Sequence, residues 1–137
     1  MKMPLSPRDI AILLNDEFGN TYNGFSKMDE DHSIGVELAE QRVRPDTCIG
    51  GDDCTLFGML PLNISVRWSK SFEETYQKAC EVMRYLSGVS KLTLQSGFRI
   101  ECIIPTDGIP ISIGKTNDIS EFIVRVNVHY KFKEDLI

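Results

Sequence analysis

The sequence lacks the features that mark several large classes of protein. Its four cysteines include no C-x-x-C pair, and no apolar run approaches the roughly 20 residues that span a bilayer. The first residues lead into a capped helix and not into the apolar core of a signal peptide. We therefore expect a protein that folds in a reducing cytoplasm, keeps its thiols free and has no membrane partner.

The chain also lacks an excess of basic residues. Its 15 Lys and Arg stand against 20 Asp and Glu, which gives a formal net charge of −5. A protein that grips nucleic acid through the phosphates normally carries more Lys and Arg than acids. The 42% hydrophobic and 26% charged residues are those of an average globular chain, and 137 residues predict a single domain over the whole length.

Helical periodicity and capping residues predict two helices. Ser6, Pro7 and the acid at Asp9 mark the start of the first helix, and Gly19 marks its end. A capping box, Ser71 to Glu74, opens the second helix. We expect the apolar face of this second helix to consist of Phe72, Tyr76, Ala79, Cys80, Met83 and Leu86.

Alternation of apolar and polar residues predicts four strands, at 34–38, 56–68, 98–102 and 122–132. Pro61 indicates an edge or a bulge, Cys102 falls on the core side, and residues 105–117 are rich in turn formers. The predicted fold class is α+β. It is a four-stranded, mainly antiparallel sheet with two helices packed on one face, in the order α-β-β-α-β-β.

The polar residues of these strands fall together on the sheet face turned away from the helices. Such a mixed-charge face is left either to solvent or to a partner. A nucleic-acid platform is the alternative, although strand aromatics fall on the buried side, with only Phe57 left open. The face consists of Glu37, Asn63, Ser65, Arg67, Arg99, Glu101, Arg125, Asn127, His129 and Lys131.

No residue pattern predicts catalysis. His32 and His129 lack the flanking motif of a nucleophile and base, so we expect surface histidines and no enzyme. A small enzyme with a cryptic site stays open as an alternative. Gly50 and Gly51 are not followed by Lys-Ser or Lys-Thr, and therefore predict a hairpin tip and not a phosphate loop.

Metal and cofactor sites are not predicted either. The acids at 29–31 and 52–53 lack the spacing of a calcium loop and are expected to be solvated charges. Cys48 and Cys54 flank the tip, but a zinc ion would need two further ligands.

Two stretches carry a resemblance to a known family. LNISVRW at 62–68 runs into FEETY at 72–76, and PISIG at 110–114 precedes FIVRV at 122–126. Together with the order of elements, they resemble phage tail terminators, often called minor capsid proteins in siphophages and prophages of Gram-positive bacteria. The resemblance covers nearly the whole chain. In that family a segment like 110–114 typically lies in the loop between the last two strands.

The resemblance implies a structural role. Tail terminators cap the tail tube, stop its polymerisation and offer the surface on which the filled head docks. They act as a ring, usually a hexamer, and can be monomers before they meet the tube. The implied partners are further copies of the chain, the tail tube protein and the head connector, with DNA passing through without specific binding. The implied location is the virion tail, with assembly in the host cytoplasm.

Long polar segments and the basic last strand supply candidate contacts. We expect residues 20–31 and the tip loop 44–54 to meet the tube or the connector, because both are long and polar in an otherwise compact domain. The candidate interface residues are Asp29, Glu30, Asp31, Arg44, Gly50, Gly51, Asp52, Asp53, Arg67, Arg125, His129 and Lys131.

Deletion of Gly50 to Asp53 tests the tip loop. We expect a folded monomer that no longer caps tail tubes, because the loop supplies contacts and not core. Circular dichroism measures folding and electron microscopy of tubes measures capping. Capping at the level of the unaltered chain would contradict the role of this loop.

Overall fold

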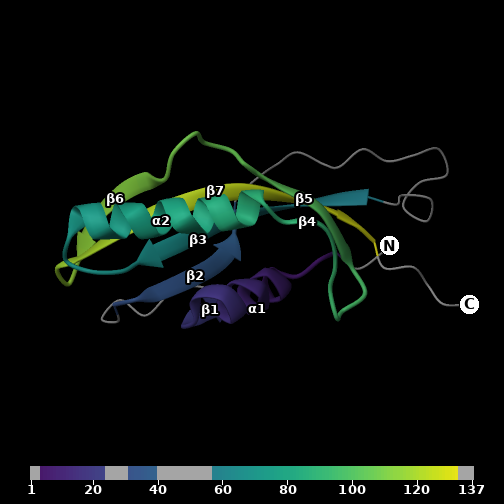
Figure 1. Cartoon of the computed structure of the whole chain (residues 1–137), viewed down its shortest axis with the longest axis horizontal. Helices are drawn as coiled ribbons and strands as arrows, with labels where there is room; N and C mark the ends of the chain where they lie inside the picture. Colours follow the sequence, from purple (N-terminus) through teal and green to yellow (C-terminus); the bar gives the residue numbers. More distant parts are fainter. Residues whose placement is uncertain (1–3, 24–30, 40–56, 133–137) are drawn as a thin grey trace, which may run out of the picture.

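Two helices and a curled, mixed sheet of seven strands make up the fold in the computed structural model, which describes residues 4–23, 31–39 and 57–132 (Figure 1). The elements are α1 (Pro7–Phe18), β1 (Thr21–Asn23), β2 (Ser33–Leu38), β3 (Phe57–Arg67), α2 (Phe72–Ser87), β4 (Ser90–Thr93), β5 (Arg99–Pro105), β6 (Ile111–Thr116) and β7 (Ile119–Lys131).

The predicted α+β class is confirmed, but the predicted number of four strands is wrong. β2, β3, β5 and β7 are the expected strands, and β1, β4 and β6 are additional. β1 and β4 have three and four residues, too few for a clear alternating pattern, and in β6 a register shift between Ser112 and Gly114 interrupts the alternation. β6 lies inside the segment 105–117 that was expected to be a loop, and β1 pairs in parallel with β2, which makes the sheet mixed.

The sheet is organised around the pairing of β3 with β7. These strands run antiparallel with eleven residues in register, from Phe57 opposite Lys131 to Arg67 opposite Glu121. Even-numbered residues of both strands point into the core, where Leu62, Ile64 and Val124 are fully buried. The odd-numbered residues therefore form the opposite face, which we call the outer face.

The other strands extend the sheet on both sides of this pair, in the order β1-β2-β3-β7-β5-β4. β6 also pairs with β7, at residues 119–123, whereas β5 pairs with residues 126–131. Because β3 occupies the other side of β7, β5 and β6 lie one after the other along the same edge. The connection between them, residues 106–110, leaves and rejoins that edge near Arg125.

Both helices contribute to one hydrophobic core together with the inward side chains of the sheet. The predicted caps are confirmed: the Ser6 hydroxyl accepts a hydrogen bond from Arg8 N, and the Ser71 hydroxyl accepts one from Glu74 N. Gly19 ends α1 with φ +75°, as its position predicted. In the described part of the chain, neither helix is long and apolar enough to cross a membrane.

The predicted apolar face of α2 is wrong in part. Its buried residues are Thr75, Ala79, Val82 and Leu86, whereas Phe72 is 55% exposed. The buried stripe of α2 is therefore rotated about the helix axis by part of a turn relative to the predicted stripe. The cause is the first turn, where the Thr75 hydroxyl lies within hydrogen-bonding distance of the Ser69 and Ser71 carbonyls, so that a threonine can occupy a fully buried position.

A bulge in β5 overturns the predicted orientation of Cys102. The pairing register shifts between Ile100 and Cys102, and beyond this point Ile103 points into the core instead. Cys102 stands opposite His129 on the outer face and is only partly buried. An extra residue in one strand reverses the alternation that follows it, and the sequence pattern alone does not reveal this reversal.

Pro61 lies in an interior strand, so the predicted edge position is wrong. β3 is paired with both β2 and β7, and Pro61 stands opposite Asn127. The Pro61 carbonyl accepts a hydrogen bond from Ala39 N, one residue past the end of β2. The nitrogen of Pro61, which has no hydrogen to donate, therefore faces the position where β2 has ended.

Gly58 is required where β3 passes the ring of Tyr130. A Cβ atom built at Gly58 would lie 2.6 Å from Tyr130 Cζ, and Tyr130 is only 3% exposed. We expect Gly58→Ala to lower the free energy of unfolding by about 1–3 kcal/mol, because the ring has little room to move. Urea denaturation measures this change.

Two further variants separate the clash from a general effect of alanine. Gly108→Ala is the matched control, because no atom lies within 4 Å of the added Cβ, and it should leave stability within about 0.5 kcal/mol. Combining Gly58→Ala with Tyr130→Leu should cost less than the sum of the single variants. Strict additivity would contradict the proposed clash.

Candidate functional site

The outer face carries polar side chains in rows that cross the strands. Glu37 stands opposite Asn63, and Asn63 stands opposite Arg125, which forms a row over β2, β3 and β7. Arg67 and Glu121 form a second row, and Lys131 and Arg99 form a third near the other end of β7. The predicted polar face therefore exists, and its members come from four strands, β2, β3, β5 and β7.

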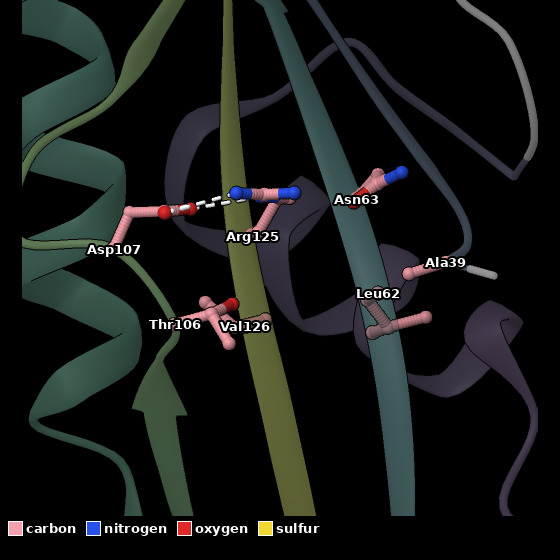
Figure 2. A pocket seen from close by; sticks show the side chains of 7 residues that line it. All are labelled: Ala39, Leu62, Asn63, Thr106, Asp107, Arg125 and Val126. Atoms are coloured by element: carbon pink, nitrogen blue, oxygen red, sulfur yellow. Dashed lines mark hydrogen bonds and ion pairs between the residues drawn. The ribbon is translucent and has the colours of Figure 1, made fainter. Parts of the chain in front are cut away.

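Arg125 lies at the centre of this face and is held by Asp107. Its Nε and Nη2 donate to the two carboxylate oxygens of Asp107, at 2.8 and 2.9 Å. Figure 2 shows the guanidinium of Arg125 between Asp107 on one side and Asn63 on the other. A backbone hydrogen bond adds to this contact: Thr106 N donates to the Arg125 carbonyl at 2.9 Å. The β5–β6 connection is thus fastened to β7 at two points.

A shallow pocket of about 360 Å³ opens beside this ion pair (Figure 2). Its polar lining is Asn63, Thr106, Asp107 and Arg125. Asn63 Oδ1 is buried and has no hydrogen-bond partner among the described residues. The pocket therefore places the unpaired Oδ1 of Asn63 near the guanidinium of Arg125, which Asp107 already holds.

The electrostatics of the face follow from these neighbours. The pKa of Asp107 is lowered, chiefly by the hydrogen bonds from Arg125. The pKa of Glu37 is raised, first by its burial and then by the negative charge of Glu121. Asp107 therefore stays ionised to a lower pH than an ordinary aspartate, whereas Glu37 takes up its proton at a higher pH than an ordinary glutamate.

Arg67 is not exposed, contrary to its predicted place on an open polar face. Its side chain is 2% exposed and makes an ion pair with Glu121 at 3.2 Å. A buried arginine of this kind needs its carboxylate, because an uncompensated buried charge is costly. With only 2% of its surface exposed, the Arg67 side chain is not accessible to a partner in this structure.

His129 and Lys131 lie near the end of β7 together with an exposed aromatic ring. Lys131 stands between Phe57 on β3 and Arg99 on β5. Phe57 is 54% exposed, and Arg99 lies 3.5 Å from the Glu101 carboxylate. This end of the outer face combines bases with one aromatic side chain.

Asp31 lies at the opposite end of the sheet, just before β2. It contacts the neighbouring His32, whose ring packs at a tilt of 58° against Trp68 with the ring centroids 4.6 Å apart. Lys78 of α2 lies 4.5 Å from the centre of the Trp68 ring and 2.9 Å from Glu81. His32 is exposed, as predicted, and its ring also belongs to the cluster that links the end of β3 with α2.

The predicted site residues do not gather at one place. Asp29, Glu30, Arg44, Gly50, Gly51, Asp52 and Asp53 lie outside the described residues. Glu121, the partner of Arg67, and Lys131 are ten residues apart on one strand, a separation of about 33 Å. Asp31 and Arg67 therefore lie at one end of the face. Arg125 lies at its centre, and His129 and Lys131 lie at the other end.

Exposed apolar side chains form the remaining candidate contacts, which the polarity of the sequence did not reveal. Large hydrophobic residues with at least half of their surface exposed are Ile12, Leu38, Phe57, Phe72, Ile104, Ile109 and Ile113. One group lies on and beside β6, namely Ile109 and Ile113. Another residue, Ile12, lines an open groove between α1 and the β4–β5 hairpin.

Metal and redox chemistry have little to build on in the described ranges. Within residues 4–23, 31–39 and 57–132, no three His, Cys, Asp or Glu side chains gather where they could hold a metal ion. Cys80 and Cys102 are free thiols. Cys48 and Cys54 fall outside the described residues.

The Asp107–Arg125 pair predicts a measurable dependence on pH. The pKa of Asp107 is lowered in the fold, so the pair stabilises the β5–β6 connection above the ordinary carboxyl pKa. That contribution is lost as the pH falls through the lowered pKa. In a carboxyl-carbon NMR titration, Arg125→Gln should move the midpoint of Asp107 up towards the ordinary value. Arg99→Gln is the matched control and should leave this midpoint unchanged; an equal effect of both variants would contradict a specific pair.

Comparisons with family models, with curated proteins and with solved structures gave no match. The chain's own features that bear on function are the mixed-charge outer face and the exposed apolar side chains on α1, just before β6 and within β6.

Proposed function

We propose that this chain is a structural protein of a phage tail, which caps the tail tube, ends its polymerisation and provides the surface for joining the head. It acts as a ring, most simply a hexamer, built from copies of this domain. Its partners are the tail tube protein and the head connector, and DNA passes through the ring without being specifically bound. The protein works in the virion tail and assembles in the host cytoplasm.

The observation that carries this proposal is that each arginine on the described outer face lies beside a carboxylate. Arg125 and Arg67 are hydrogen-bonded to Asp107 at 2.8 Å and to Glu121 at 3.2 Å. Arg99 lies 3.5 Å from the Glu101 carboxylate without a hydrogen bond from its Nε. An arginine already held by a carboxylate is a poor phosphate ligand, because binding would have to break that pair. A face of neutralised ion pairs is better suited to contact protein surfaces than to grip nucleic acid.

The exposed apolar side chains support an assembly role as well. An isolated hydrophobic residue on a surface is ordinary, but several on edge elements indicate protein contacts. Here they include Ile109 and Ile113 on one side and Ile12 on another. A domain with separate contact patches is the kind of subunit that builds a ring.

The net charge agrees with the passage of DNA. A formal charge of −5 on each chain is multiplied in a ring of copies. A ring of that sign repels the phosphate backbone and does not hold it, so that DNA can slide through. This reasoning supports an assembly through which DNA moves and opposes a DNA-gripping module.

Electron microscopy of the protein mixed with its tail tube protein tests the proposal. We expect tubes of limited length with a ring at one end, because the cap stops the addition of further tube subunits. Tubes polymerised alone are the reference and should be longer and open-ended. Unlimited tubes without terminal density in the mixture would contradict the proposal.

A nucleic-acid-binding module is the second candidate, and one row of the outer face favours it. Phe57, Lys131 and Arg99 stand opposite one another, which places a ring for stacking beside two bases. Binding through this row would give retention on single-stranded DNA or RNA that falls steeply with salt and is lost with Phe57→Ala. No retention at low salt would leave tube capping as the better explanation of the face.

A further inference from the structure

The sheet curls so that the β4–β5 hairpin lies towards α1 without closing into a barrel (Figure 1). Residues of α1 and of this hairpin line an open groove of about 240 Å³. Its apolar lining is Ile12, Leu13, Leu92 and Leu94, of which the three leucines also pack against the core. Asp9 and Asp16 stand along the same stretch of α1. We call this feature the α1 groove.

β6 is the exposed edge of the sheet at the other end of the molecule. Among the described strands it pairs only with β7, so its second edge carries backbone groups available for pairing. Ile109 just before it and Ile113 within it are 62% and 50% exposed. Lys115 follows Ile113 by two residues and is also exposed. We call Ile109, Ile113 and Lys115 the β6 patch.

The α1 groove and the β6 patch are complementary in charge. The groove carries the carboxylates of Asp9 and Asp16 beside its apolar lining, and the β6 patch carries Lys115 beside its exposed isoleucines. Ile113 lies at the bulge of β6, where the register against β7 shifts between Ser112 and Gly114 and Gly114 has φ +99°. Lys115 is therefore not held at the spacing or on the face that a regular strand would give it relative to Ile113.

The edge strands add a second complementarity. β4 pairs only with β5 among the described strands and lines the groove through Leu92 and Thr93. A strand entering the groove would lie beside this edge and could continue the sheet from one molecule into the next. The two features are therefore complementary: the α1 groove is apolar with acidic residues, and the β6 patch is apolar with a basic residue.

We propose that β6 of one copy docks in the α1 groove of the next copy, and that this head-to-tail contact builds the ring. The inference rests on the proposed function and identifies the surface through which the ring forms. In Figure 1, β6 lies at the upper left, whereas the elements that border the groove, α1 and the β4–β5 hairpin, lie at the lower centre and the right. A contact between two different patches repeats around a rotation axis and closes into a ring, whereas a self-complementary patch gives only a dimer.

Three isoleucines with the same 50% exposure give matched variants: Ile12, Ile113 and Ile104. Ile12→Glu and Ile113→Glu should each raise the concentration needed for ring assembly by about 30-fold or more, the effect of losing a well-packed contact residue. Ile104→Glu lies on β5 outside both patches and should assemble like the unaltered chain. Native mass spectrometry measures the rings, and thermal melting confirms that every variant is folded.

Mixing the two defective variants gives the sharpest test. The Ile12→Glu subunit keeps an intact β6 patch, and the Ile113→Glu subunit keeps an intact α1 groove. Their mixture should therefore form heterodimers that cannot grow into rings, although each variant alone stays monomeric. Normal ring assembly by either variant alone, or the absence of heterodimers from the mixture, would overturn the proposed contact.

A charge exchange checks the attraction between Lys115 and the acids of the groove. Lys115→Glu should weaken ring assembly by about two- to five-fold, and adding Asp16→Lys in the same chain should recover at least part of this loss. No recovery in the double variant would remove the charge complementarity from the proposal. If the unaltered chain caps tubes as a ring but the isoleucine variants do so too, only the contact is wrong. If the unaltered chain never caps tubes, the proposed function itself fails.

Discussion

The rest of the structure depends on the long antiparallel pairing of β3 with β7. Eleven residues in register fix which side chains enter the core and which form the outer face. β2 joins one side of this pair, and β5 and β6 join the other, so that each row of side chains inherits its order from the same register. A shift by one residue would exchange the two faces, bring Arg125 into the core and expose Val124.

The sequence predicted those features that depend on local patterns. Alternation in β3 and β7 and the serine caps of both helices were correct because each is determined by neighbouring residues. Cys102 was misplaced because a bulge reverses the alternation in β5, and β6 was missed because a bulge before Gly114, which has φ +99°, interrupts its alternation. The centre of the candidate site could not be predicted, since Asp107 and Arg125 meet from 18 residues apart and only the folded sheet joins them.

The same arrangement explains how a chain of average composition can present apolar side chains at the edges of its sheet. The charges of the outer face are largely satisfied within one subunit, by pairs such as Arg125 with Asp107. The exposed apolar side chains lie at the margins of the domain. Ile113 lies on the edge strand β6, and Ile12 lines the α1 groove. A closed barrel would have no such groove, and a flat sheet would not bring β4 towards α1. The incomplete curl of the sheet thus accounts for both halves of the proposed head-to-tail contact.

The central claim is that copies of this domain form a ring at the end of a tail tube through two different patches. A cryo-electron microscopy reconstruction of isolated tail ends tests it most directly. We predict a closed ring of this fold at the end of the tube, with β6 of each subunit lying against α1 and β4 of its neighbour. A tube end without this fold, or subunits related by two-fold contacts through identical patches, would contradict the account.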